Sequence, residues 1–143
     1  DLETIFRESD FVTVHARLTE ETKGMISKDL IDLMNNGYFI NTSRAEIVDQ
    51  IALERALKEK RIAGAALDVV KIGEKYPVNP REFYASYLKN APDIVKMDNV
   101  IVTPHIGGLT REIRAWSVEM LAEEVARFIN GKKLENVLNP EVL

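Results

Sequence analysis

The chain has no cysteine among its 143 residues and only two histidines, His15 and His105. Without cysteine it forms no disulfide, offers no thiolate metal ligand and has no cysteine nucleophile. The two histidines are far apart in the sequence and match no metal-ligand spacing. We therefore predict no metal site, and the lack of disulfides fits a reducing, cytoplasmic location.

Long apolar runs and basic clusters are absent as well. No stretch approaches the roughly 18 apolar residues of a membrane span, and the first three residues carry neither the basic start nor the apolar core of a secretory signal. The formal net charge of -4, the pI of about 5.3 and the lack of a basic cluster with interleaved aromatics argue against a nucleic-acid surface. We predict a soluble protein that binds neither membranes nor nucleic acids.

The composition and the local patterns of the sequence fit a globular chain in which helices and strands alternate. Its 45% hydrophobic and 29% charged residues are ordinary for a chain with a packed core. Ser27 and Asp49 are good N-caps for two helices. Apolar and β-branched runs predict strands at residues 11–15, 38–40, 62–69 and 99–103. This alternation predicts an α/β fold with a parallel sheet covered by helices on both faces.

Two segments depart from the alternation. Residues 70–98 contain several prolines and aromatics and predict a long, partly helical excursion, since a structureless loop of that length is unusual. Thr110 predicts the start of a long helix that stops at Gly131. Its apolar residues at helical spacing are Val118, Leu121, Ala122, Val125 and Ile129. We expect this stripe to belong to a core rather than to a partner-binding groove, and the apolar tail 134–143 to dock on something.

Four groups of residues that could bind a ligand or take part in a reaction fall at or just after predicted strand ends. They are His15, the run Asn41-Thr42-Ser43-Arg44, Asp68, and His105 within Thr103-Pro104-His105-Ile106-Gly107-Gly108. Because the carboxyl ends of parallel strands meet at one edge of a sheet, we expect these groups to surround one small molecule. The adjacent glycines, Gly107 and Gly108, are expected to free the backbone after His105.

Each of these residues also has a plainer interpretation. The guanidinium of Arg44 matches a substrate carboxylate, but it also suits a surface salt bridge. Asp68 is suited either to bind a ligand amide or hydroxyl or to cap a turn, and 41–43 form either a binding loop or simply a turn. For His15 a structural role is favoured, and a lone histidine such as His105 is more often structural than catalytic. The residues alone leave these alternatives open.

The motifs taken together closely resemble the nicotinamide-binding half of the D-isomer-specific 2-hydroxyacid dehydrogenases. The resemblance covers nearly the whole chain. It is carried, in the family's order, by residues 9–15, 18–24, 40–44 with 47–49, 63–69 and 99–108. The resemblance implies hydride transfer between NAD and a D-2-hydroxy acid or 2-keto acid, in a protein that forms a homodimer at full length.

The resemblance also implies roles for individual residues. His105 would act as general acid in ketone reduction and as base in the reverse direction, and Arg44 would bind the substrate carboxylate and carbonyl oxygen. Glu74 is the candidate partner of His105, although Gly73 occupies the family's usual offset for that glutamate. Cofactor contacts are implied for His15, Ala16, Thr42, Ser43, Arg44, Asp68, His105, Gly107 and Gly108.

One departure from the family concerns the phosphate loop. None of the seven glycines forms G-x-G-x-x-G. We therefore expect the second half of a Rossmann-like doubly wound parallel sheet, with residues 1–109 as a partial NAD-binding domain. Residues 110–143 would form a connecting helix and tail toward the substrate domain, and the chain alone would be an inactive fragment. The alternatives are an NAD-sensing co-repressor or scaffold of the same fold, and a structural or dimerisation module.

Overall fold

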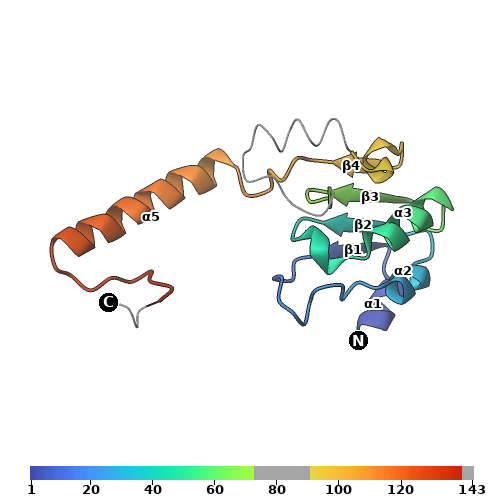
Figure 1. Cartoon of the computed structure of the whole chain (residues 1–143), viewed down its shortest axis with the longest axis horizontal. Coiled ribbons are helices and arrows are strands. Elements are labelled where there is room, and N and C mark those ends of the chain that lie inside the picture. Colours follow the sequence, from blue (N-terminus) through green and yellow to red (C-terminus); the bar gives the residue numbers. More distant parts are fainter. Residues whose placement is uncertain (73–90, 140–143) are drawn as a thin grey trace. The chain divides into compact units, whose positions relative to one another are not determined.

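A computed structural model describes residues 1–72 and 91–139 of the chain. Its centre is a parallel sheet in the order β1-β2-β3-β4, whose strands are stacked in chain order and point the same way (Figure 1). The strands are β1 (Phe11–Val14), β2 (Tyr38–Asn41), β3 (Gly64–Leu67) and β4 (Val100–Val102). They lie where the apolar runs predict them, and the α/β fold class is confirmed.

Three short helices precede or connect the strands. They are α1 (Leu2–Glu8), α2 (Lys28–Leu33) and α3 (Gln50–Lys58), with the 3-10 turns η1 (Ala45–Ile47) and η2 (Asp93–Lys96). The predicted caps start two of them, because Ser27 Oγ accepts from the Leu30 N–H at 3.5 Å and Asp49 Oδ1 accepts from the Ala52 N–H at 3.0 Å.

The core lies between one face of the sheet and these helices. Alternate strand residues such as Val12, Phe39 and Leu67 are buried together with helix residues such as Phe6 and Leu53. The opposite face carries Phe11, Tyr38 and Ile101, which are exposed. Within residues 1–72 and 91–105, helices therefore cover only one face of the sheet, unlike the cover on both faces that the alternation predicts.

Residues 106–143 form a second compact unit, separate from the unit of Asp1–His105. Its helix α5 (Arg111–Ile129) starts at Thr110, whose hydroxyl accepts from the Ile113 N–H at 3.2 Å. The helix stops at Gly131, where φ is +61° and the N–H groups of Gly131 and Lys132 close back on the last turn. Both predicted ends are confirmed, and the division lies close to the expected boundary at 109/110, whose functional assignment stays a prediction.

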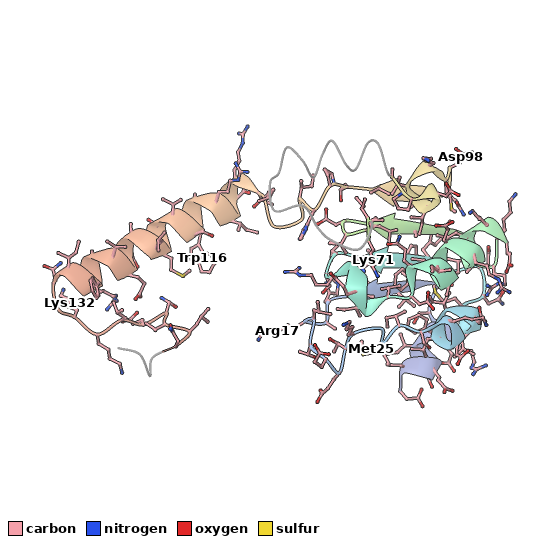
Figure 2. All side chains as sticks on the ribbon, viewed as in Figure 1. Arg17, Met25, Lys71, Asp98, Trp116 and Lys132 are labelled. Carbon is pink, nitrogen blue, oxygen red and sulfur yellow. The ribbon has the colours of Figure 1, made fainter. Side chains whose placement is uncertain are left out.

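The prediction that the apolar stripe of α5 is buried in a core is wrong for the described residues. No residue of α5 is buried: Val118, Leu121 and Ile129 are 69%, 66% and 75% exposed, and Trp116 projects from the helix (Figure 2). Helical spacing determines which residues share a face, but it does not supply the surface that covers them. Over the described residues, no helix has the length and apolarity needed to cross a bilayer.

The tail after α5 docks on α5 itself through polar contacts. The Glu124 carboxylate accepts from the Glu135 N–H and from Asn136 Nδ2, both at 3.1 Å. Arg127 forms an ion pair with Glu135 at 2.9 Å. The expectation that this segment docks is thus confirmed for its first residues, while residues 140–143 lie outside the described part of the chain.

The residue after α3 has a conformation that normally favours glycine. Lys60 has φ of +56°, and its N–H donates to Leu57 O at 3.1 Å in the helix-ending motif that usually carries glycine. Because a left-handed backbone costs a residue with a Cβ about 1 kcal/mol, Lys60→Gly is expected to raise the free energy of unfolding by about 0.5–1 kcal/mol. Urea denaturation with an unchanged m-value measures this difference.

Lys60→Ala is the matched control, since it removes the ammonium but keeps the Cβ. Its free energy of unfolding should stay within about 0.5 kcal/mol of the parent value. A glycine variant no more stable than the alanine variant would show that the left-handed backbone at Lys60 carries no such cost.

Candidate functional site

The four strands end in a single row. Val14 pairs with Asn41, Asn41 with Leu67, and Leu67 with Val102. The carboxyl ends of all four strands are therefore aligned along one edge of the sheet. His15, Thr42, Asp68 and Thr103 are the first residues beyond the row. The predicted convergence of strand ends is confirmed, and it brings the loops that carry most of the candidate residues to one edge.

The loop after β2 is organised by Asn41, which is only 2% exposed. Its Oδ1 accepts from the Ser43 N–H at 2.9 Å, and its Nδ2 donates to Arg44 O at 3.0 Å. Ser43 Oγ also donates to the carbonyl of Ala16, which joins this loop to the one after β1. The turn interpretation of 41–43 is therefore correct as a description of the backbone. An asparagine at the end of an apolar strand, followed by two small polar residues, was the signal available in the sequence for the organising role of Asn41.

Arg44 presents its guanidinium at this edge. The side chain is exposed, and Nη1 donates to the carbonyl of Ser43 at 2.8 Å. Across residues 1–72 and 91–139, Arg44 forms no ion pair, so the surface salt bridge considered from the sequence is not seen. The guanidinium therefore remains available to an external carboxylate.

Asp68 places a buried carboxylate at the end of β3. The residue is 6% exposed, and its Oδ1 accepts from the hydroxyl of Thr103 at 2.5 Å. Its N–H donates to Asn41 O at 2.9 Å, while the Thr103 N–H donates to Leu67 O at 3.0 Å. Both backbones are thereby held to the sheet, and the hydrogen bond from Thr103 offsets part of the cost of burying the carboxylate.

His105 has an unusual backbone. Its φ is +54°, and its N–H donates to Asp68 O at 2.9 Å and to Thr103 O at 3.0 Å. The sequence predicts that glycines supply the special conformation here, but neither Gly107 nor Gly108 has positive φ. That expectation is wrong, because the two carbonyls that hold the His105 amide place the turn at the histidine itself. Such strain of about 1–3 kcal/mol in a non-glycine residue is concentrated at functional sites.

His15 is the other histidine at this edge, directly after β1. It is exposed, and its Nε2 lies 2.9 Å from the Thr13 hydroxyl. Ala16 follows it and contributes its carbonyl to the contact with Ser43. Glu74 lies outside the described residues, so its pairing with His105 stays a prediction.

The segment that follows Asp68 is clamped to the start of α3. Gln50 Oε1 accepts from the Lys71 N–H at 2.7 Å, and Gln50 Nε2 donates to Lys71 O at 3.2 Å (Lys71 is labelled in Figure 2). Val70 and Ile72 on either side of Lys71 are buried. Sequence reasoning did not single out Gln50, because a contact between residues 50 and 71 has no periodic signal.

Within residues 1–72 and 91–105, the groups with shifted pKa values lie away from this edge. Hydrogen bonds from Lys28 and Arg61 lower the pKa of Asp32 below its usual range, and the hydrogen bond that Lys58 donates to Glu54 raises the pKa of Lys58. These residues belong to α2, α3 and the turn after α3, where they form exposed ion pairs. Their shifts reflect surface charge pairing and not a reactive site.

A shallow groove of about 660 Å³ also lies elsewhere, at the amino ends of the strands. Its lining includes Asn36, Ile62, Ala63, Met97 and Asn99. Asp98 of this groove and Arg17 of the loop after β1 mark opposite ends of the sheet in Figure 2. In the described ranges, no group of three or more His, Asp or Glu side chains is placed to hold a metal ion. The carboxyl edge is thus the candidate site on the strength of its polar side chains.

The chain matches a known family over most of its length. Residues 1–107 match the model described as the D-isomer specific 2-hydroxyacid dehydrogenase, NAD binding domain. The glyoxylate reductase of Thermococcus litoralis is 40% identical over 144 residues, a match that covers 100% of this chain and 39% of that protein. The D-3-phosphoglycerate dehydrogenase of Archaeoglobus fulgidus is 35% identical over 97% of this chain and 24% of its own length. The chain spans well under half of each of these relatives.

Solved structures agree with these matches. The NAD-complexed D-isomer specific 2-hydroxyacid dehydrogenase of Lactobacillus delbrueckii ssp. bulgaricus has a TM-score of 0.79 and 29% identity, covering 97% of this chain and 43% of that one. The D-lactate dehydrogenase with NAD+ from Lactobacillus jensenii has a TM-score of 0.78 and 31% identity, covering 96% and 42%. The chain belongs to the D-isomer-specific 2-hydroxyacid dehydrogenase family, and its residues 1–107 correspond to that family's NAD-binding domain.

Proposed function

We propose that residues 1–143 form the nicotinamide-binding part of a longer NAD-dependent D-2-hydroxyacid dehydrogenase. The observation that carries this proposal is the single row of strand ends. It brings the loop of Arg44, the carboxylate of Asp68 and the backbone of His105 to one edge of a parallel sheet. A guanidinium can bind the carboxylate of a small keto acid, a hydrogen-bond acceptor can hold the nicotinamide, and an imidazole can transfer the proton.

The polar groups of this edge fit the nicotinamide end of the cofactor. The Asp68 carboxylate is an acceptor for an amide or a ribose hydroxyl, and the loop after β2 offers hydroxyl and backbone groups. The residues proposed to hold the cofactor are His15, Ala16, Thr42, Ser43, Arg44, Asp68, His105, Gly107 and Gly108. No glycine loop of the G-x-G-x-x-G type is present for the pyrophosphate, so other residues of the full-length protein would bind that part.

Bound NAD would supply the group that accepts or donates the hydride, and the protein's own residues would handle the substrate and the proton. Arg44 binds the substrate carboxylate and polarises the carbonyl oxygen through its planar set of N–H donors. His105 donates a proton to that oxygen during reduction and removes it during oxidation. Glu74 is proposed to hold the imidazole in position.

We propose glyoxylate and similar small 2-keto acids as the first substrates to test. This choice follows from the glyoxylate reductase relatives. The phosphoglycerate dehydrogenase relatives make 3-phosphoglycerate the second choice. The substrate proposal concerns the full-length protein, which we also propose to be a cytoplasmic homodimer.

The test measures oxidation of NADH and NADPH with a panel of 2-keto acids, and reduction of NAD+ with 3-phosphoglycerate, using the full-length protein and the 143-residue chain in parallel. We expect turnover by the full-length protein only, because the chain alone lacks a pyrophosphate loop. Turnover by the 143-residue chain would refute the inactive-fragment part of the proposal. A folded full-length protein that binds NADH but reduces no 2-keto acid would instead support the co-repressor or scaffold alternative.

A further inference from the structure

We propose that Thr103 is a positioning residue for the cofactor. Its hydroxyl would hold the Asp68 carboxylate in the orientation that accepts an N–H of the nicotinamide carboxamide. This inference rests on the proposed function. It assigns a role to the residue directly after β4, to which the sequence alone assigned no role of its own.

Contacts with the sheet fix both backbones of the Thr103–Asp68 pair. The Thr103 N–H donates to Leu67 O at 3.0 Å, which continues the β3–β4 ladder one residue past the last strand pair. The Asp68 N–H donates to Asn41 O at 2.9 Å. With both main chains held, the 2.5 Å hydrogen bond from the Thr103 hydroxyl acts on the rotation of the Asp68 carboxylate.

The chemistry of threonine suits this task. Its branched Cβ restricts χ1, so a strand-end threonine directs its hydroxyl with less rotational freedom than serine. The acceptor is a carboxylate that is 6% exposed, and hydrogen bonds to an ionised acceptor are about twice as strong as neutral ones. The hydroxyl therefore has the strength and the direction to favour one orientation of the Asp68 carboxylate.

Thr103 also links this carboxylate to the proposed acid. The Thr103 carbonyl accepts from the His105 N–H at 3.0 Å, and the Asp68 carbonyl accepts from the same N–H at 2.9 Å. One residue thus contacts both Asp68 and His105. Thr103→Val removes the hydroxyl yet keeps the branched shape and the backbone groups, so it isolates the effect of the hydroxyl on the carboxylate.

The experiment measures dissociation constants by isothermal titration calorimetry on the full-length protein. The two ligands are NADH and its 3-acetylpyridine analogue, in which an acetyl group without N–H donors replaces the carboxamide. We expect Thr103→Val to weaken NADH binding about tenfold, as for loss of a hydrogen bond to a charged group, and to change binding of the analogue less than about twofold. Thr103→Ser should bind NADH within about threefold of the parent protein.

Thr4→Val is the matched control, because Thr4 lies in α1 and its side chain is remote from the row of strand ends. If Thr103→Val weakened the binding of NADH and of the analogue equally, the inference would be overturned. A general loss of structure at the strand ends would affect both ligands alike. Unchanged binding of NADH would overturn it as well. If circular dichroism shows that the valine variant is unfolded, the comparison of Thr103→Ser with Thr103→Ala carries the same test.

The outcome separates this inference from the proposed function. A parent protein that binds neither NADH nor the analogue contradicts the proposed function itself. A parent protein that binds NADH, combined with a valine variant that binds it equally well, contradicts only the role of Thr103.

Discussion

Replacing His105 by asparagine is expected to lower the turnover of the full-length protein by at least about 10²-fold, the usual contribution of a general acid or base. Asparagine cannot exchange a proton near neutral pH, but it tolerates the positive φ of +54° at this position better than most residues. The free energy of unfolding of the variant should therefore lie within about 0.5 kcal/mol of the value for the parent protein. Steady-state turnover with glyoxylate and NADH, together with urea denaturation, measures both quantities.

The matched control is His15→Asn, which changes the other histidine of the same edge. His15 is proposed to contact the cofactor, so this substitution should raise the KM for NADH more than it lowers turnover. Unchanged turnover in the His105→Asn variant would remove His105 from the mechanism.

Replacing Arg44 by lysine should lower kcat/KM for the keto acid about 10–10²-fold, and replacing it by alanine should lower it further. Lysine keeps the positive charge but loses the planar pair of donors, and each hydrogen bond to a charged group contributes about 1.5–3 kcal/mol. Because the guanidinium has no ion-pair partner among the described residues, the loss cannot be attributed to a broken surface salt bridge. Initial rates over a range of glyoxylate concentrations give this ratio.

Arg55→Lys is the control for Arg44→Lys. Arg55 lies on α3, where it pairs with Glu59 at 2.9 Å, and the same chemical change there should leave kcat/KM within about twofold. Guanidinium ion added to the Arg44→Ala variant should restore part of the lost rate. An Arg44→Lys variant as active as the Arg55→Lys variant would show that Arg44 does not bind the substrate carboxylate.

The parts of the fold that depend on neighbouring residues were predictable. Ser27, Asp49 and Thr110 each cap the helix expected from their side chains, and Gly131 ends α5 in the left-handed conformation expected of glycine. These are local effects, in which a side chain bonds to a backbone group a few residues away. The parallel order of the strands followed in turn from their alternation with helices.

The features that depend on distant residues were not predictable. Thr103 and Asp68 are separated by a long stretch of chain, and nothing in their local pattern indicates that they share a hydrogen bond. The positive φ fell on His105 instead of a glycine, because the carbonyls of Asp68 and Thr103, the residues that follow β3 and β4, hold its amide. The apolar stripe of α5 was correct as a helical face but wrong as a core, since burial requires a covering surface as well as a pattern.

The level row of strand ends also bears on how such a protein can diversify. Insertions in the connections that begin beyond the row do not change the pairing of Val14, Asn41, Leu67 and Val102. The connection between β3 and β4, residues 68–99, is the longest of them and begins at the proposed cofactor contact Asp68. Exchange or lengthening of that connection beyond Glu74 therefore leaves the paired strand ends of the proposed site in place, so new substrate preferences need not compete with the stability of the sheet.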